Sequence, residues 1–311
     1  MVQAPGVDAL LTESYALLTR LDLAGATSLL EEALASDFES PEILCALKYA
    51  RWWADATARV ERCADPLEAG DHCLNRWLAF LDFRKRLSAE MERPSLAFKH
   101  YAFGLALSRY AELEKPGEQG DPELALRMGR AYKGMGDYDS AIDRLEAAAK
   151  LRKDDPAVLA ELADCYGLIG ELRPSKALFR EAFFLNPQKI ALDMIESDSV
   201  SKLVGKALEH AQSLHEAAEW VPVYGEIMGV FSVKRELKPM EAGKLKQTIY
   251  EMESELSSDG SRRPLLLPRL INRYFWLLDC YMNRREPKER LDEILLKIKL
   301  LDPNVYKLYI A

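Results

Sequence analysis

One pattern of small and aromatic residues occurs twice in the middle of the chain, and Gly129 in the first copy is followed 34 residues later by Ala163 in the second. Each copy predicts two helices, because apolar residues recur at helical spacing on both sides of a glycine. The chain is expected to reverse at that glycine, so that the second helix packs antiparallel on the first. Small residues let the two backbones approach closely, and aromatic rings fill the space beside them. The pattern consists of Gly129, Tyr132, Gly136, Tyr138, Ala141, Leu145 and Ala148 in the first copy, and of Ala163, Tyr166, Gly170, Leu172, Ser175, Phe179, Ala182 and Pro187 in the second.

This order of residue types at a period of about 34 resembles the tetratricopeptide repeat. Residues 132–151 fit the repeat closely. The second copy differs at Ala163, Leu172 and Ser175, and all three preserve small size or apolar character. The resemblance implies antiparallel helix pairs stacked into a right-handed superhelix. It also implies a concave face that binds an extended peptide or a helix of a partner.

The N-terminal third of the chain predicts helices of a less regular kind. Apolar spacing indicates a helical hairpin at 8–37, and prolines mark the starts of longer helices at 41–62, 66–87 and 94–114. These helices exceed the length that the repeat uses, so residues 1–114 are expected to form an irregular stack or degenerate repeats. Residues 115–121 are rich in glycine, proline and charge and predict a linker.

Residues 190–311 are also expected to be helical. Short helical stretches at 189–196 and 199–213 and an amphipathic helix at 239–256 precede a flexible turn at 257–263 and a degenerate third copy of the repeat at 264–303. The stretch 220–231 is the most apolar in the chain, and Pro222 with two glycines argues against a long regular helix there. A buried core segment and an exposed interaction patch both remain open for this stretch. No long segment alternates as a strand does, so the predicted fold class is all-α.

Burial of apolar faces connects these parts. A helical hairpin cannot bury both of its faces alone, and about three stacked units are needed for a stable array. The two clear copies at 122–189 are therefore expected to pack on neighbours at both ends. The sequence predicts one continuous right-handed superhelical α-solenoid made of regions 1–114, 122–189 and 190–311.

Charge and cysteine content exclude several classes of protein. A formal charge of −8, from 42 Lys and Arg against 50 Asp and Glu, argues against general nucleic-acid binding, which requires basic patches. No apolar run reaches the length of about 18 residues that a transmembrane helix needs, so a soluble protein is expected. The five cysteines lack the spacing of a disulfide framework. Free cysteines and the absence of a visible secretory signal favour the cytoplasm, and a processed start would leave a periplasmic location open.

The sequence contains no pattern that indicates catalytic, cofactor-binding or metal-binding residues. The segment from His215 to Glu219 resembles a zinc-protease helix, but Glu219 stands where that helix needs its second histidine. Cys63, His72 and Cys73 are three scattered ligands, whereas a structural zinc site uses four in paired spacings. Neither a phosphate-binding glycine loop nor a nucleophile elbow is present. The sequence therefore predicts a protein that is not an enzyme and holds no cofactor.

The resemblance also implies which side chains line the concave groove. They lie on the first helix of each pair, and they are Glu123, Leu126, Arg130 and Lys133 in the first copy and Ala157, Ala160, Asp164 and Gly167 in the second. The alternative interpretation is that these positions merely face solvent.

The best-known groove of this kind clamps the C-terminal carboxylate of a chaperone with Lys, Asn and Arg side chains. In this chain Leu126 and Arg130 replace the first Lys and the first Asn, and Glu161 replaces the second Asn. Glu161 places a negative charge where the carboxylate of the ligand would lie, and like charges repel. A chaperone C-terminal tail is therefore not expected as the partner.

The leading hypothesis is a non-catalytic scaffold or adaptor that binds another protein, as a peptide or a helix, in this groove. One alternative is a structural subunit of a larger bacterial-type assembly of the envelope or of motility, and self-association is left open. A third is an enzyme with a helical repeat domain, for which the N- and C-terminal regions leave room. Nucleic acid is not expected as a partner.

Overall fold

The secondary structure of the chain is helical. The computed structural model describes residues 6–87, 91–114, 120–258 and 260–311. Within these ranges the chain forms 15 α-helices and three short 3₁₀ helices, and no strand. Most helices pack on a helix that is adjacent in sequence. The predicted all-α class, of the kind formed by stacked helix pairs, is therefore confirmed. The chain divides into two compact units, residues 1–148 and 149–311.

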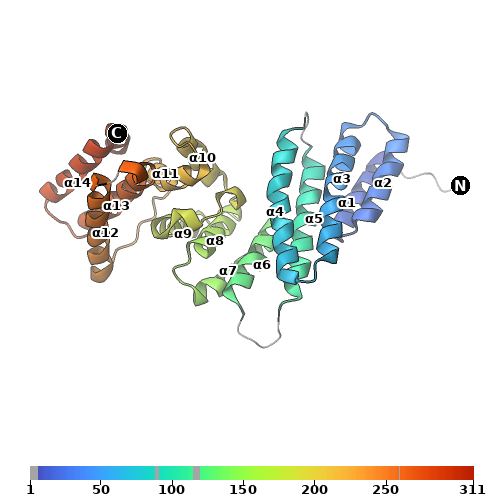
Figure 1. The fold of residues 1–311 in the computed structure, drawn as a ribbon, viewed down its shortest axis with the longest axis horizontal. Helices are drawn as coiled ribbons and strands as arrows, with labels where there is room; N and C mark the ends of the chain where they lie inside the picture. Colours follow the sequence, from blue (N-terminus) through green and yellow to red (C-terminus); the bar gives the residue numbers. More distant parts are fainter. Residues whose placement is uncertain (1–5, 88–90, 115–119, 259) are drawn as a thin grey trace. The chain divides into compact units, whose positions relative to one another are not determined.

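The first unit holds α1 to α6 and most of α7 (Figure 1). The bounds of these helices are α1 Val7–Thr19, α2 Leu23–Ser36, α3 Pro41–Arg62, α4 Pro66–Lys85, α5 Glu92–Ala111, α6 Pro122–Met135 and α7 Tyr138–Leu151. α1 packs on α2 and α5, and α5 also packs on α4 and α6. The predicted hairpin and the three predicted long helices of this region are confirmed to within about three residues at each end. Most of the predicted linker, residues 115–119, lies outside the described part of the chain.

Proline and aspartate set the starts of several helices. Pro41, Pro66 and Pro122 lie in the first turn of their helices, where the missing N–H costs little because the first N–H groups have no partner within the helix. Asp65 and Asp121 precede two of these prolines. Each carboxylate accepts a hydrogen bond of 2.9 Å from a backbone N–H of the first turn. These local bonds explain why the helix starts can be predicted from sequence.

Aromatic rings of α3, α4 and α5 fill the core of the first unit. The ring centroid of Tyr49 on α3 lies 4.8 Å from that of Phe80 on α4 and 5.7 Å from that of Phe98 on α5. Trp53 lies 6.1 Å from Tyr101 of α5. All five side chains are buried. Edge-to-face pairs add about 0.5–1.5 kcal/mol to the free energy of burial, so this cluster holds the three long helices side by side (Figure 1).

The first copy of the repeat forms the helix pair α6–α7. Gly136 ends α6 in the left-handed conformation, with φ of 82°, and the N–H of Asp137 donates to the carbonyl of Tyr132 at 3.0 Å. Gly129 of α6 lies against Leu145 of α7, since a Cβ at Gly129 would be 2.6 Å from the Leu145 Cγ. Leu145 is fully buried at this contact, and Tyr132, whose ring was predicted to fill the space beside Gly129, is only partly buried.

The second unit holds α8 to α15 and three single-turn 3₁₀ helices (Figure 1). The bounds of the α-helices are α8 Pro156–Leu168, α9 Leu172–Leu185, α10 Asp198–Leu208, α11 Leu214–Ile227, α12 Pro239–Ser258, α13 Arg263–Asn283, α14 Lys288–Leu301 and α15 Pro303–Ile310. The 3₁₀ helices are η1 Pro187–Lys189, η2 Leu192–Met194 and η3 Gly260–Arg262. Consecutive helices pack as α8 on α9, α10 on α11, and α12 on α13, and α13 also contacts α11 and α14.

The apolar stretch 220–231 lies in the core of the second unit, and the prediction that it forms no long helix is wrong. α11 continues through Pro222 to Ile227. Burial of its apolar side chains outweighs the one backbone hydrogen bond that a proline cannot make. Beyond the helix end, Phe231 folds back onto Gly225, where a Cβ would be 2.3 Å from the ring. The buried side chains of this stretch include Trp220, Val221, Val223, Tyr224 and Phe231.

Residues 264–303, predicted as a degenerate third copy of the repeat, form the packed helix pair α13–α14. α12 is longer than predicted and takes in the start of the expected turn at 257–263, which then continues as η3; residue 259 lies outside the described residues. α15 was not predicted. Asp302 caps it by accepting hydrogen bonds from the N–H groups of Asn304 and Val305 at 2.9 and 3.0 Å. The proposed grouping of all regions into one continuous solenoid stays a prediction.

Candidate functional site

The predicted groove residues of α6 differ in their access to solvent. Glu123 and Arg130 are partly exposed, whereas Leu126 and Lys133 are buried. Lys133 retains only 1% of its surface. A ligand that approaches α6 therefore meets Glu123 and Arg130, which lie about two helical turns apart on one face.

Glu123 belongs to a charge network that ties three helices of the first unit together. Its carboxylate pairs with Arg127, one turn along α6. The Nε of Arg127 donates to Asp71 of α4 at 2.8 Å, and the hydroxyl of Tyr110 on α5 donates to the same oxygen at 2.7 Å. Burial would lower the pKa of Arg127, but its bonds with Asp71 and Glu123 outweigh burial and raise it. This network holds the face of α6 in place on α4 and α5.

On α8, two of the predicted groove residues hold neighbouring elements of the second unit. Asp164 is fully buried, and its two carboxylate oxygens accept hydrogen bonds from the backbone N–H groups of Glu196 and Ser197 at 2.9 and 2.8 Å. Those bonds hold the segment that leads into α10. Gly167 lies where α8 meets α9, because a Cβ there would be 3.1 Å from the Ser175 Oγ. The structure thus gives Asp164 and Gly167 packing roles that the sequence did not indicate.

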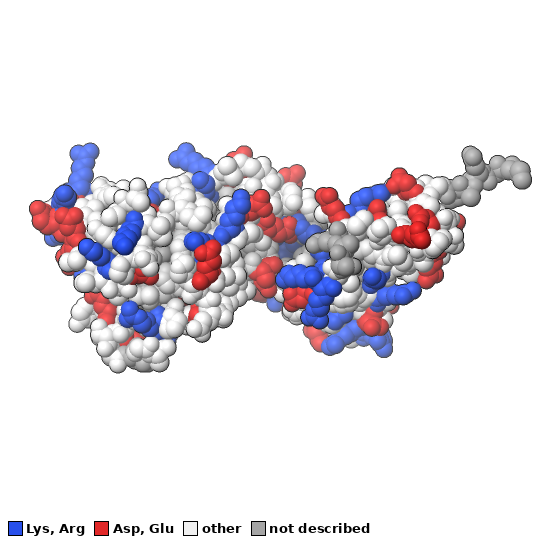
Figure 2. All heavy atoms as spheres, turned by 90° about the horizontal axis from the view of Figure 1, so that it is seen from above, with Lys and Arg blue, Asp and Glu red and all other residues white. Residues whose placement is uncertain are grey.

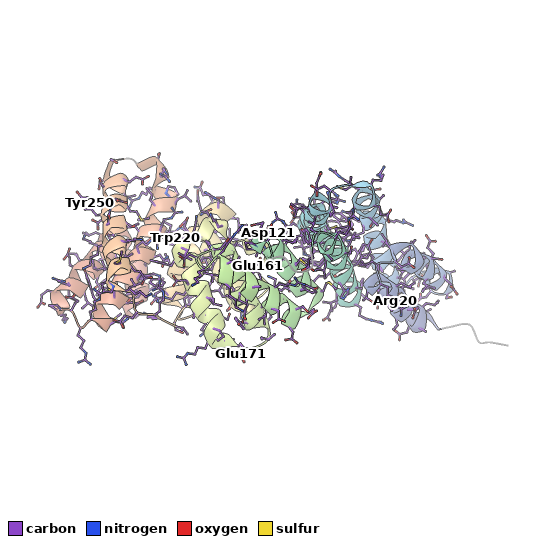
Figure 3. The ribbon with its side chains drawn as sticks, turned by 90° about the horizontal axis from the view of Figure 1, so that it is seen from below. Arg20, Asp121, Glu161, Glu171, Trp220 and Tyr250 are labelled. Carbon is purple, nitrogen blue, oxygen red and sulfur yellow. The ribbon has the colours of Figure 1, made fainter. Side chains whose placement is uncertain are left out.

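The other predicted positions of α8 are Ala157, which is partly exposed, and Ala160, which is buried. α8 ends before Glu171, which lies at the turn into α9 (Figure 3). The assignment of all eight positions to a groove stays a prediction.

A polar pocket of about 230 Å³ opens between the end of α3 and the start of α4 in the first unit. Its lining residues are Arg59, Val60, Cys63, Glu68, Asp71, His72 and Asn75. Two of its reactive groups are already engaged: Asp71 by Arg127 and Tyr110, and the Cys63 thiol by the carbonyl of Asp65 at 3.4 Å. Burial first, and then the charges of Arg59 and Arg76, lower the pKa of His72.

Within the described residues no group of three or more His, Cys, Asp or Glu side chains has a geometry that could hold a metal ion. Of the three ligands considered from sequence, Cys73 is buried, and burial raises the pKa of its thiol to about 12. A thiol with so high a pKa is a poor metal ligand, because metals bind the thiolate.

Four charged side chains form a ring inside the second unit. Arg180 of α9 pairs with Asp279 of α13 and lies 3.4 Å from Glu226 of α11. Lys234, in the segment after α11, pairs with both acids, at 2.6 Å to Glu226. Burial would lower the pKa of Lys234, but the bonds to Asp279 and Glu226 outweigh it and raise the pKa. Each cation thus contacts both acids, and the ring joins three helices and one connecting segment.

Two arginines and two aromatic side chains stack beside these four charges, and the stack was not predicted from the sequence. The ring centroids of Phe184 on α9 and Trp276 on α13 are 4.0 Å apart. The Arg273 guanidinium lies 4.1 Å over Phe184, and that of Arg180 lies 4.2 Å over Trp276. The signal that could have revealed the stack is the spacing of Arg269, Arg273 and Trp276, which places all three on one face of α13.

Comparison with known proteins accounts for the centre of the chain. A family described as "Tetratricopeptide repeat" matches residues 122–165. The chain contains a tetratricopeptide repeat. The match begins at the first residue of α6 and ends inside α8, so it covers the first copy of the pattern and the start of the second. No curated protein matches the chain.

The matched repeat lies within an all-helical fold, and such repeats point to protein–protein interaction in general. Among the described helices none is both long and apolar enough to cross a membrane. The visible surface of each unit carries charges of both signs, scattered rather than gathered into a basic stripe (Figure 2).

Proposed function

We propose that the chain is a non-catalytic scaffold or adaptor that binds a segment of another protein along α6, the first helix of a repeat pair. The observation that carries the proposal is the match of the tetratricopeptide repeat to residues 122–165. Two features of α6 support it. Glu123 and Arg130 are charges of opposite sign on one partly exposed face, and the network through Arg127 and Asp71 holds that face rigidly.

A pull-down with the full chain and its Arg130→Glu variant tests this proposal. The charge reversal changes the partly exposed face of α6 and leaves the buried Lys133 in place, and circular dichroism checks that the fold is preserved. The matched control is Lys150→Glu, which reverses an exposed charge on α7, the second helix of the pair. The same partner should be recovered with the wild type and with Lys150→Glu, and its recovery with Arg130→Glu should fall about tenfold or more, as expected for a charge contact worth roughly 1.4 kcal/mol. Equal recovery in all three would contradict the assignment of α6.

A structural subunit of a larger assembly is the second candidate, and an apolar surface on the last two helices favours it. Leu296 and Leu300 lie one turn apart on α14, with 54% and 75% of their surfaces exposed. Leu308 and Ile310 of α15 are about half exposed. Light scattering of the purified chain separates the two candidates. A monomer that binds a partner segment supports the adaptor, and self-association that Leu300→Glu abolishes supports the subunit.

A further inference from the structure

Arg273 of α13 differs from the other arginines around it. Arg269 pairs with Glu219, Arg235 pairs with Glu181 and Glu241, and Arg180 belongs to the charge ring. Within the part of the chain that the structure describes, Arg273 has neither a hydrogen bond nor an ion pair. Its Nε is buried without a partner. Its contact with its surroundings is the ring of Phe184 beneath one face of the guanidinium.

The acids near Arg273 are committed to other cations. Glu219 of α11 is fully buried and accepts hydrogen bonds from Arg269 and, at 2.8 Å, from the Gln188 side chain. Glu181 of α9 accepts two bonds from Arg235, at 2.8 and 2.9 Å. Both carboxylates therefore satisfy other donors. They act on Arg273 only through their negative charge, which raises its pKa. Two larger effects act in the opposite direction.

Two larger effects oppose the positive charge of Arg273. Burial, and then the neighbouring charge of Arg269, lower the pKa of Arg273 to about 10. An arginine remains charged at neutral pH even so. A charge that is left without its partner away from water is costly for a fold. Arg273 is such a charge, because it has no partner within the described residues. The contact with the ring of Phe184 stabilises the guanidinium on one face only, so the N–H donors at its edge are left for a ligand.

We propose that Arg273 binds a carboxylate from an acidic side chain of a protein partner, with the ring of Phe184 as the apolar floor of the contact. Phe184 covers one face of the guanidinium, so a ligand must approach its edge, where the N–H donors lie in the fork that matches a carboxylate. A singly charged carboxylate fits better than a phosphate dianion, because Glu181 and Glu219 add negative potential nearby. This site lies on α9 and α13, apart from the α6 surface proposed above, and does not depend on it.

Two blocked tripeptides, one with a central Glu and one with a central Gln, test the proposal on the full chain at constant ionic strength. The Arg273 Nε–H resonance, identified by its loss in Arg273→Met, should shift as the Glu peptide is added and stay in place with the Gln peptide. The Glu peptide should also raise the thermal midpoint of the wild type. That rise should persist in Arg263→Met, which removes an exposed arginine at the start of the same helix, and should vanish in Arg273→Met.

The unliganded variants give an independent check. Arg273→Met replaces a partly buried, unpaired cation by an apolar side chain. The thermal midpoint of the variant without peptide should therefore be no lower than that of the wild type, and higher by up to about 2 °C. A lower midpoint would mean that the cation is compensated within the chain, and the proposal would be overturned. Equal responses to the two peptides, or a larger shift of the Nε–H resonance with inorganic phosphate than with the Glu peptide, would overturn it as well. The pull-down with Arg130→Glu does not touch α13, so either proposal can fail while the other stands.

Discussion

The Cγ of Leu145 on α7 lies 2.6 Å from the point that a Cβ at Gly129 on α6 would occupy. Real Cβ atoms do not come so close to a neighbour, so any side chain at Gly129 must displace the Leu145 side chain or push the two helices apart. Gly129→Ala is therefore expected to destabilise the chain by about 1–3 kcal/mol through overpacking. Urea denaturation checks this through a lower midpoint at an unchanged slope.

Gly205 on α10 provides the control for this substitution. A Cβ at Gly205 would meet no atom within 4 Å. Gly205→Ala is expected to stabilise the chain by about 0.5–1 kcal/mol, because alanine loses less backbone entropy in a helix than glycine. Stabilisation by both substitutions would show that α6 and α7 are not in close contact at Gly129.

A second prediction concerns Asp164, whose carboxylate binds backbone N–H groups before α10 rather than a ligand. Asp164→Ala leaves the N–H groups of Glu196 and Ser197 without their acceptor and is expected to cost about 2–4 kcal/mol. Hydrogen exchange should then be faster at the start of α10 than elsewhere in the second unit. Asp154→Ala removes an exposed carboxylate before α8 and should change neither quantity. Unchanged exchange at α10 in Asp164→Ala would contradict the role assigned to this carboxylate.

The helices of this chain could be predicted where their ends are set locally. Pro66 follows Asp65, and Gly136 ends α6 with a positive φ, and both signals act within a few residues. The prediction failed at Pro222, where burial of the surrounding side chains decides in favour of the helix. Local propensity does not contain that information.

The candidate sites could be predicted less well, because their residues meet only in the folded chain. Arg180 and Asp279 are 99 residues apart in sequence. No spacing rule joins them. The buried state of Lys133 was equally out of reach, since helical periodicity predicted a groove position for it. Only the spacing of Arg269, Arg273 and Trp276 could be read from the sequence as one face of a helix, and it was not used for a prediction.

Glu253 predicts a loss of stability in acid. This residue of α12 accepts hydrogen bonds from the hydroxyl of Tyr274 on α13 and, at 2.9 Å, from the Nζ of Lys297 on α14. Burial would raise the pKa of the Glu253 carboxyl, but these bonds outweigh it and lower the pKa below 4.5. Stability that comes from a lowered native pKa is present above the pKa of the unfolded chain and is lost as the pH falls through the native pKa.

Glu253→Gln should therefore be less stable than the wild type by roughly 1–2 kcal/mol at neutral pH. The difference should narrow as the pH falls from the pKa of glutamate in the unfolded chain through the lowered pKa of Glu253, where the wild-type carboxylate takes up its proton. Thermal midpoints measured between neutral and acidic pH check both statements. Glu251→Gln, on an exposed position of the same helix, should follow the wild type throughout. A constant difference between Glu253→Gln and the wild type at every pH would contradict the proposed bonds.

The charge ring of the second unit allows the sharpest test of cooperative packing. Asp279→Asn removes one acid and leaves Arg180 and Lys234 with Glu226 alone, so it is expected to cost about 3–5 kcal/mol. Arg180→Met combined with the same Asp279→Asn removes one charge of each sign and leaves the Lys234–Glu226 pair intact. The double substitution should therefore cost less than the sum of the two single substitutions, by more than about 1 kcal/mol. Urea denaturation of the wild type, both single variants and the double variant measures this coupling. Additive costs would mean that the four side chains do not act as one unit, and that the apolar contacts of α9 and α13, rather than the ring, hold these helices together.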